Sequence, residues 1–359
     1  MAGSERQRPA AAEGALDWRQ LRALLVAGVK LDIRTTRTGM GRGRIPPFVV
    51  ALITYTVMGT LMAFGLRSGG PFVYSLFTIS AAMFLTALTV IMEYVTIVVH
   101  PDDHQILAHR PVSSRTYFWA KMGNLLFYVT PISLALTTPA AVLGSVTFDA
   151  GALYGVSHVA MGLLGCVATS AAIVLIYTAA LRVVSYERFT SVMTYVHTGA
   201  TLILVLAYFL LPRMIEDDPM LLSFSKGAWV YFAPPAWFAG TVELMIGQGG
   251  GQNVVLVLIA LGGSAAVIAA AMNTVSLDYS RKLSELTTAP GRARKAEESV
   301  SGRRRFFFRA GLRTLGRGEE RAGYVLMDAY MSRDRKLRSR VYPAFGLPFA
   351  VYVVALIMK

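Results

Sequence analysis

The chain has few cysteines and few charges, and both shortages narrow what it can be. Its single cysteine, Cys166, excludes an intramolecular disulfide and a thiolate metal cluster. Charged residues make up 16% of the 359 residues, against about a quarter in ordinary soluble proteins. The sequence also lacks a Gly-x-x-x-x-Gly-Lys-Ser/Thr loop, the motif whose backbone amides cradle nucleotide phosphates. These absences exclude a disulfide-stapled secreted domain and a P-loop enzyme.

Long apolar runs are what the sequence has instead. Hydrophobic residues make up 54% of the chain, and its mean hydropathy is +0.50. A helix of about 20 apolar residues is long enough to cross a bilayer. Seven runs reach or approach this length: Pro47 to Leu66, Phe72 to Val99, Met122 to Val146, Ala152 to Leu181, Thr190 to Leu211, Val254 to Val275 and Val341 to Met358. The sequence therefore predicts an all-α, polytopic integral membrane helical bundle, with a six-span half followed by a seventh span.

Positive charge is unevenly divided between the segments that separate these runs. With a cytosolic N-terminus, 31 of the 35 Lys and Arg residues lie on the cytosolic side, and only Arg67, Arg213 and Lys226 lie outside. Cytosolic loops of membrane proteins carry such an excess. The net charge of +14 thus follows mostly from topology. We expect the basic segment 281–340 to contact anionic membrane lipid rather than nucleic acid.

The N-terminal segment predicts an amphipathic helix that lies on the membrane surface. At about 100° per residue, one helix face collects apolar residues and another collects basic ones. The apolar face holds Trp18, Leu21, Leu25, Val29 and Ile33, and the basic face holds Arg19, Lys30, Arg34 and Arg37. The basic face would meet lipid headgroups. The alternative is a short soluble helix packed on a partner.

A similar pattern returns 302 residues further along the chain. The matched pairs are Leu24 with Leu326, Leu25 with Met327, Val29 with Met331, Asp32 with Asp334, Arg34 with Lys336 and Pro46 with Pro348. Many transporters are built from such repeats. The pattern predicts that a second copy starts here. The chain would then be part of a longer transporter, or a second subunit would complete it.

Residues 100–121 form a polar island between two apolar runs, so they are expected to lie in water. Pro111 lacks a backbone donor and restrains the residues before it, so it can end a short helix sharply. Ser113 or Ser114 could then cap the helix that becomes the third span. A stiff element joined to two spans would transmit force. The alternative is an ordinary hydrophilic connection.

The same island also permits an enzymatic interpretation. His100, His104 and His109, with Asp102 and Asp103, supply imidazole and carboxylate groups that could hold Zn or Fe at a membrane surface. Membrane di-iron oxygenases use several clusters of this kind. Only two further histidines occur in this chain, His158 and His197. The metalloenzyme using the His100–His109 cluster is therefore the second hypothesis.

The island resembles a loop of known membrane proteins. The sequence Asp102-Asp103-His104-Gln105-Ile106-Leu107, then Arg110-Pro111-Val112-Ser113 and Tyr117-Phe118-Trp119-Ala120-Lys121, is similar to the permease subunit of type-2 ABC exporters. The resemblance covers about residues 16–276. It implies that Asp102 to Ser114 is a coupling element that docks on a separate ATPase subunit, and that Leu16 to Arg37 is the connecting helix. The expected coupling residues are Asp102, Asp103, Leu107, Arg110, Pro111, Val112 and Ser113, and those of the interfacial helix include Trp18, Leu21, Leu25 and Arg34.

The predicted outside segment, residues 212–253, is rich in aromatic residues around Pro234-Pro235. Trp229, Tyr231, Phe232, Trp237 and Phe238 are of the kind that settles at a membrane–water boundary, and a short apolar helix could follow over 243–247. The resemblance implies short re-entrant helices here, where an amphiphilic substrate would leave. A simple interfacial anchor is the alternative.

These observations together give one functional expectation. Residues 1–46 would be a cytosolic N-terminus with the connecting helix, 47–275 a six-span permease half, 276–340 a basic cytosolic loop with the start of a second repeat, and 341–359 a seventh span. The chain would be the permease of an ATP-driven exporter in the bacterial inner membrane. It would need no cofactor of its own, because ATP would be bound by the partner subunit. Spans built of Leu, Val, Ala, Thr, Met and Phe suit a hydrophobic or amphiphilic substrate.

The topology can be tested with introduced cysteines at positions 105 and 300. Both are expected to stay unlabelled by a membrane-impermeant thiol reagent in intact cells, because the charge asymmetry places them in the cytosol. Permeabilised cells provide the positive control, in which both should react. Labelling of either position in intact cells would contradict the topology.

Overall fold

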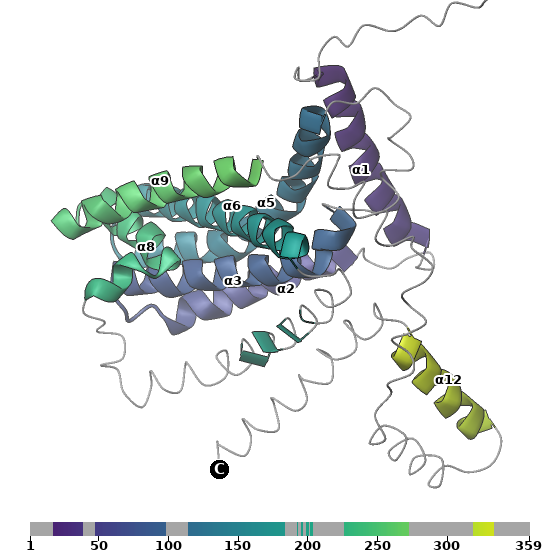
Figure 1. The fold of residues 1–359 in the computed structure, drawn as a ribbon. Helices are drawn as coiled ribbons and strands as arrows, with labels where there is room; N and C mark the ends of the chain where they lie inside the picture. The colour runs from purple at the N-terminus through teal and green to yellow at the C-terminus, as the bar shows by residue number, and fades with distance from the viewer. Residues whose placement is uncertain are drawn as a thin grey trace, which may run out of the picture. The chain divides into compact units, whose positions relative to one another are not determined.

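The computed structural model describes residues 17–38, 47–97, 114–183, 226–272 and 319–333, with seven single positions between 192 and 203. Over these residues all regular structure is helical. The chain forms two compact units, one of residues 1–184 and 214–284, the other of residues 185–213 and 285–359. The helices from α1 to α9 belong to the first unit (Figure 1).

Five of the described helices are long and apolar enough to cross a membrane. They are α2 (Pro47–Gly65), α3 (Pro71–Ile97), α5 (Ser114–Thr147), α6 (Gly151–Val183) and α9 (Gly251–Met272). Each coincides with a predicted apolar run, so the prediction of a multi-pass, all-helical membrane protein is confirmed over the described residues. The predicted spans at 190–211 and 341–358 lie outside them, apart from the single positions between 192 and 203.

The spans define two ends of the first unit. The short turns at residues 66–70, 148–150 and 246–250 lie where α3, α6 and α9 begin, and this end is called the turn end. At the opposite end, called the α1 end, α2 and α5 begin and α3 stops. Helix α3 is the most enclosed span, with 67% of Pro71–Ile91 buried, whereas 11% of Phe48–Gly65 in α2 is buried. The core therefore lies between α3, α5 and α6, and α2 covers one side.

Helix α1 (Trp18–Thr38) begins where an aspartate can cap it. Asp17 Oδ1 accepts hydrogen bonds from the backbone N–H groups of Arg19 at 2.9 Å and Gln20 at 3.2 Å, two donors that a helix start leaves free. The backbone N–H of Asp17 also donates to Thr116 Oγ1 at 3.3 Å. This bond ties the start of α1 to the first turn of α5.

The apolar face of α1 packs on α5 over its first three turns. Leu21 is buried, while Trp18 on the same predicted face is 73% exposed. A Cβ atom at Gly123 of α5 would lie 2.5 Å from Leu25 Cδ2, and one at Gly28 would lie 2.2 Å from Asn124 Nδ2. The two helices can approach this closely because both positions are glycine.

Helix α5 has 34 residues, a length of roughly 51 Å at 1.5 Å per residue. It is longer than a bilayer core of about 30 Å, so part of it extends beyond the lipid. It begins at Ser114, where the sequence predicted a capped start, and it contains Pro131 and Pro139. Its first turns lie beside α1 and run in a different direction from the rest of the helix (Figure 1).

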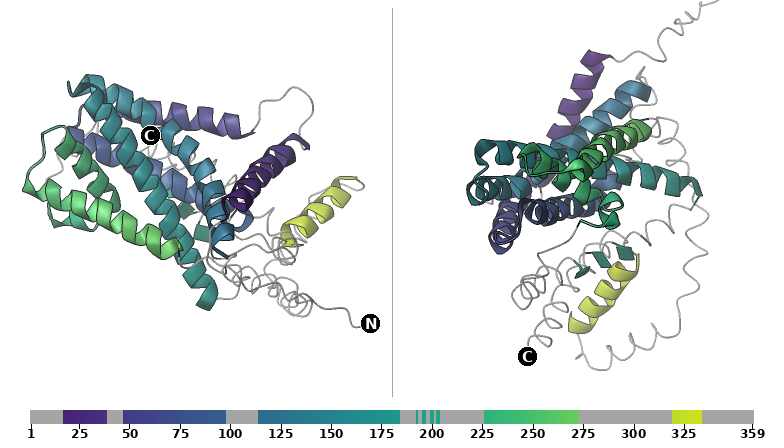
Figure 2. Two further views of the ribbon diagram at one scale, coloured as in Figure 1. Left: turned by 90° about the horizontal axis from the view of Figure 1, so that it is seen from above. Right: turned by 90° about the vertical axis from the view of Figure 1, so that its left-hand side faces the viewer.

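Two short helices complete the first unit. The 3₁₀ turn η2 (Ala228–Tyr231) is followed by α8 (Pro234–Met245), which packs on α3, α6 and α9. Both views in Figure 2 keep α8 beside α9. Helix α8 begins nine residues before the short helix expected at 243–247, so that expectation had the wrong start.

The second unit contains α12 (Glu319–Arg333). This is the place where the 302-residue offset predicts a second copy of the N-terminal helix. The presence of a helix at this place is consistent with the repeat. It does not test the duplication itself, which stays a prediction. The basic segments on either side, 281–318 and 334–340, lie outside the described residues.

The close contact of α2 with α5 predicts different outcomes at two glycines. A Cβ at Gly59 would lie 2.5 Å from the backbone oxygen of Leu136, whereas nothing lies within 4 Å of the corresponding position at Gly65. Gly59→Ala should destabilise the protein by about 1–3 kcal/mol, because backbone atoms must move apart. Gly65→Ala in the same helix is the matched control and should not lower the midpoint of thermal unfolding in detergent. Equal midpoints for both variants would contradict this packing.

Candidate functional site

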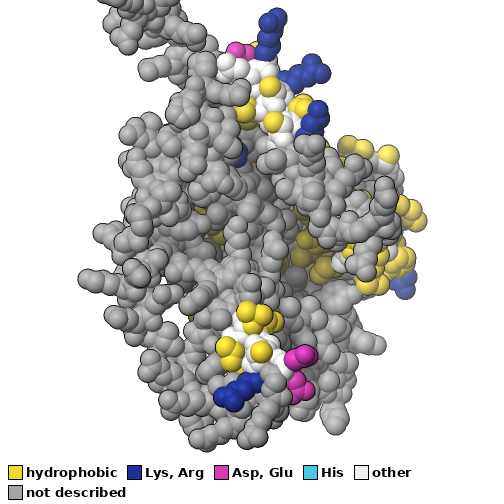
Figure 3. All heavy atoms as spheres, turned by 90° about the vertical axis from the view of Figure 1, so that its right-hand side faces the viewer, with side chains coloured by type: hydrophobic (Ala, Val, Ile, Leu, Met, Phe, Trp, Pro, Cys, Tyr) yellow, Lys and Arg dark blue, Asp and Glu magenta, His cyan; other side chains and the backbone are white. Residues whose placement is uncertain are grey.

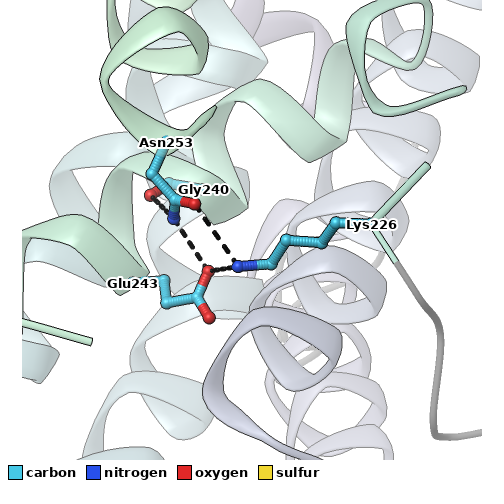
Figure 4. A network of polar contacts seen from close by, with 4 residues as sticks. All are labelled: Lys226, Gly240, Glu243 and Asn253. Carbon is cyan, nitrogen blue, oxygen red and sulfur yellow. Dashed lines mark hydrogen bonds and ion pairs between the residues drawn. The ribbon is translucent and has the colours of Figure 1, made fainter. Parts of the chain in front are cut away.

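A polar network lies at the turn end, among apolar helices. It joins three segments that are apart in the sequence: Lys226 precedes η2, Glu243 lies near the end of α8, and Asn253 lies in the first turn of α9. Figure 4 shows the three side chains converging, with the backbone oxygen of Gly240 as a fourth member. The network therefore holds the chain entering η2 against the α8–α9 pair.

Asn253 is the centre of this network and is almost fully buried, at 1% exposure. Its Nδ2 donates to Gly240 O at 2.8 Å and to Glu243 Oε2 at 2.8 Å. Its Oδ1 accepts a hydrogen bond from Lys226 Nζ at 3.3 Å. Both amide atoms thus have partners, as a buried amide requires.

Lys226 Nζ and Glu243 Oε2 form an ion pair in the same network. The two side chains are 25% and 12% exposed, so both charges are largely removed from water and each needs the other. The ammonium also lies 4.7 Å from the centroid of the Phe72 ring, at the start of α3. Its position beside the last turn of α8 is favourable for a cation, because the carboxyl end of a helix carries partial negative charge.

The turn between α8 and α9 fits around this network only with glycines. Gly247 has φ of +79°, in the left-handed region that other residues avoid. A Cβ at Gly249 would lie 2.8 Å from Leu244 Cα and 3.0 Å from Asn253 Nδ2. Larger residues at Gly249 would push the turn away from the amide.

The contacts of α8 place its start deep among the spans. A Cβ at Gly165 of α6 would lie 3.2 Å from the Phe238 ring and 3.1 Å from Met83 Sδ of α3. Met83 lies 12 residues after the start of α3 and Gly165 lies 14 after the start of α6, which correspond to about 18 and 21 Å along each helix. Trp237 lies against Gly263, which is 12 residues into α9. The first turn of α8 thus lies roughly 20 Å from the turn end, measured along these helices.

Residues 226–250 therefore enter the helix bundle and leave it at the same end. Lys226 is at the turn end, residues 228–233 run into the bundle, and α8 returns to the turn end at Met245. We call residues 226–250 the re-entrant hairpin. At 12 residues, α8 is about 18 Å long, too short to cross a membrane.

The start of α8 leaves few backbone N–H groups without a partner, as an environment without water requires. Pro234 and Pro235 occupy the first helical positions and have no N–H groups, so two of the donors that normally remain free at a helix start are absent. The N–H of Ala236 donates to Ala233 O at 2.9 Å. The indole Nε1 of Trp237 donates to Tyr231 O at 3.0 Å, which closes the bottom of the hairpin.

A second polar cluster joins α3 to α6 near the turn end. Ser75 Oγ and Tyr154 OH are 2.8 Å apart, and Tyr154 OH lies 3.4 Å from His158 Nδ1. Thr78 Oγ1 lies 3.4 Å from His158 Nε2. The rings of Tyr154 and His158 stack with centroids 5.5 Å apart. His158 is fully buried, and these bonds give both of its nitrogens a partner, so the cluster fastens two spans together.

Hydroxyl groups also gather around Cys166 in the middle of the bundle. Thr86 of α3 and Ser133 of α5 face the thiol. Neither hydroxyl has an oxygen or nitrogen partner among the described residues, although both are fully buried. Cys166 is fully buried too, so its predicted place in the core is confirmed.

The predicted coupling residues lie outside the described residues, from Asp102 to Ser113. The helices that flank them are described: α3 stops at Ile97, α5 begins at Ser114, and the two pack together. Both helix ends that border the 16 predicted loop residues are therefore at the α1 end. Of the predicted interfacial residues, Leu21 and Leu25 meet α5 and Trp18 is exposed, while the side chain of Arg34 is outside the described part.

The histidine cluster of the metalloenzyme hypothesis, His100 to His109, also lies outside the described residues. Elsewhere in the described ranges no group of three or more His, Cys, Asp or Glu side chains could hold a metal ion. The polar network at the turn end contains one carboxylate only. It has the composition of a structural tie, with one ion pair completed by an amide.

The network is absent from the predictions made from the sequence. Those predictions place Lys226 among three outside cations and Glu243 in a short helix, without pairing the two. The available signal was the occurrence of one Lys and one Glu, the two charges among 28 mostly apolar residues that end at Asn253. A charged side chain in apolar surroundings needs a partner of opposite charge. Because this stretch has only one cation and one anion, it predicts that Lys226 and Glu243 form a pair.

Comparisons with known protein families, with characterised proteins and with solved structures give no match.

Asn253→Ala should destabilise the protein by roughly 2–4 kcal/mol, because Gly240 O and part of the Glu243 carboxylate would lose their partner while buried. The neighbouring amide provides the matched control: Gln252→Ala should change the midpoint of thermal unfolding little. Limited proteolysis after Lys226 should also accelerate in Asn253→Ala alone. A thermal midpoint of Asn253→Ala equal to that of Gln252→Ala would show that the network does not hold the hairpin.

Proposed function

We propose that the chain is the membrane-spanning permease subunit of an ATP-driven ABC exporter, which moves a hydrophobic or amphiphilic substrate with energy from a separate ATPase subunit. The observation that carries this proposal is the re-entrant hairpin, which starts deep among the spans and returns just before α9. The resemblance to type-2 exporters implies short re-entrant helices at this point of the chain. The loop motif from Asp102 to Ser113 supports the same family independently.

The α1 end has the layout that docking of an ATPase requires. The segment 98–113 connects α3 to α5, and α1 packs on the first turns of α5 at the same end. The two helix ends that border the predicted coupling residues therefore lie at the same end of the bundle as the N-terminal helix. An ATPase bound there would push on two adjacent spans at once.

Distances along α5 support an interfacial position for α1. Gly123, which meets Leu25, precedes the end of α5 at Thr147 by 24 residues, or about 36 Å. This exceeds a bilayer core of about 30 Å, so a bilayer that begins at the turn end stops short of α1. Arg19, Arg22 and Lys30 are exposed on α1, and Figure 3 shows basic and apolar side chains together on this helix. Such a surface suits anionic lipid headgroups.

The proposal includes an orientation and two further partners. The α1 end faces the cytosol of a bacterial cell and the turn end faces outward, as the distribution of Lys and Arg indicates. The Lys226–Glu243–Asn253 network then closes the hairpin at the outer surface, where substrate leaves. A second permease half or subunit completes the pathway, and the ATPase supplies the nucleotide site that this sequence lacks.

Removal of the loop carboxylates should separate ATP hydrolysis from transport. In Asp102→Ala/Asp103→Ala, and separately in Pro111→Gly, we expect stimulation of the co-purified ATPase and ATP-dependent efflux of a lipophilic fluorescent dye to fall at least about tenfold. The first change weakens electrostatic steering to a complementary groove, and the second frees the backbone of a stiff element. Thermal unfolding of the membrane part should not change.

Glu319→Ala/Glu320→Ala is the matched control, because it removes two exposed carboxylates from α12 and leaves the loop intact. It should keep both activities. The metalloenzyme hypothesis predicts the reverse for the loop variants, with activity of any ATPase unchanged and bound metal lost on elemental analysis. That result, or the absence of any ATPase after purification from native membranes, would overturn the permease proposal.

A further inference from the structure

Pro131 divides helix α5 into two segments that are held by different sets of contacts. A proline inside a helix lacks the N–H that would bond to the carbonyl four residues earlier, and its ring crowds that carbonyl. Pro131 lies 16 residues before the end of α5, or about 24 Å along it. We call Ser114–Thr130 the first segment and Pro131–Thr147 the second segment.

The first segment is fastened to α1. The backbone N–H of Asp17 donates to Thr116 Oγ1, and the Leu25 side chain lies against Gly123. Gly28 meets the amide of Asn124 one residue further along α5. These contacts extend over about three turns of α1 and between two and three turns of α5, so α1 and the first segment can move as one body. The last turn of the first segment also meets α2, where the Tyr128 ring lies edge-on to Phe48 with centroids 5.9 Å apart. Tyr128 lies close to Pro131 in the helix, so a small rotation about Pro131 moves it little.

The second segment is fastened to the other spans. Tyr74 OH of α3 donates to Ala140 O at 2.9 Å, and Gly59 of α2 fits against Leu136 O. Thr137 packs on Gly162 of α6. Contacts with three helices hold this segment in the bundle.

The junction itself carries the signs of a weak point. Thr137 Oγ1 donates to Ser133 O at 2.8 Å, a local bond that competes with the helix and bends it. Asn124 Oδ1, in the first segment, is buried without a partner among the described residues, and Ser133 Oγ has only the weakly bonding thiol of Cys166 beside it. Unsatisfied buried groups raise the free energy of this conformation of α5. The free-energy difference between it and a conformation with another bend angle is therefore smaller. Sharp bends in long helices usually occur at a proline, where the backbone N–H of the hydrogen-bond ladder is missing.

We propose that Pro131 is a hinge, about which α1 and the first segment of α5 swing as one body relative to the rest of the bundle. The first segment is roughly 25 Å long, so a rotation of about 10° moves its start at Ser114 by about 4 Å. Ser114 directly follows the predicted coupling loop, and a push on that loop would therefore be converted into rotation. The use of the hinge in coupling rests on the proposed function, whereas the rotation does not.

The hinge can be measured with pairs of spin labels in lipid nanodiscs, with Cys166→Ala as the background. Two pairs cross the hinge, from Arg22 in α1 and from Trp119 in the first segment, each to Leu258 in α9. A third pair, from Val142 in the second segment to Leu258, does not cross it. All four positions are exposed. In the background protein the two crossing pairs should give distance distributions at least about twofold broader than the third pair.

Two proline variants then locate the hinge. Pro131→Ala restores the N–H and should narrow both crossing distributions by about twofold. Pro139→Ala, the matched change eight residues later in the same helix, should leave them broad. The Val142–Leu258 distribution should stay the same in every variant.

Three results would overturn the hinge. They are equal breadths for all pairs in the background protein, no narrowing with Pro131→Ala, and equal narrowing with both proline variants. Broadening of the Arg22 pair alone would indicate fraying of α1 and would also count against the proposal. If Pro131→Ala fails to fold, the comparison of breadths in the background protein still decides. No ATPase, nucleotide or substrate enters the measurement, so the hinge can stand if the permease proposal falls, and the reverse.

Discussion

The hydrocarbon interior of a membrane contains no water, so each backbone and side-chain polar group within it needs a partner in the protein. This constraint explains the main features of the first unit. Long helices satisfy their own backbones, and hydroxyl side chains such as Thr78 and Ser170 bond to carbonyls one turn earlier. The one Lys–Glu pair in the hairpin is neutralised by contact and completed by Asn253. Among the described residues the rule is met incompletely at three groups: Thr86 and Ser133 have only the thiol of Cys166 beside them in the middle of the bundle, and Asn124 Oδ1 has no partner near the junction with α1.

Much of the architecture followed from the sequence because transmembrane helices have a strong signal. Length and hydropathy located the five described spans within a few residues at most of their ends, except that α5 begins eight residues before its apolar run, at Ser114, one of the two serines considered as its cap. The start of α1 near Trp18 was also predictable from the spacing of its apolar residues. In each case the pattern is local, and the physical cause is the transfer of apolar side chains out of water.

The candidate site was less predictable, for two physical reasons. Helix α8 is short and follows Ala233, which has no side chain that can cap it, so the main N-terminal signal of a helix is missing and only Pro at the first helical positions marks the start. The bond between Lys226 and Asn253 joins residues 27 positions apart, and no local spacing predicts such a contact. The coupling loop shows the opposite situation. Its motif is distinctive in sequence, and its residues lie outside those that the structure describes.

The order of helices along the chain has a consequence for biosynthesis. Helices α3 and α6, which enclose α8 on two sides, both precede it in the sequence, and α9 follows directly after the Gly247 turn. During synthesis the walls of the hairpin are therefore in the membrane before the hairpin itself emerges. A segment as short as α8 could not remain in lipid alone, but it can slot into a space already built and be locked there when the next span arrives. The proline pair at its tip, which leaves no donor groups to shield, makes that late insertion less costly.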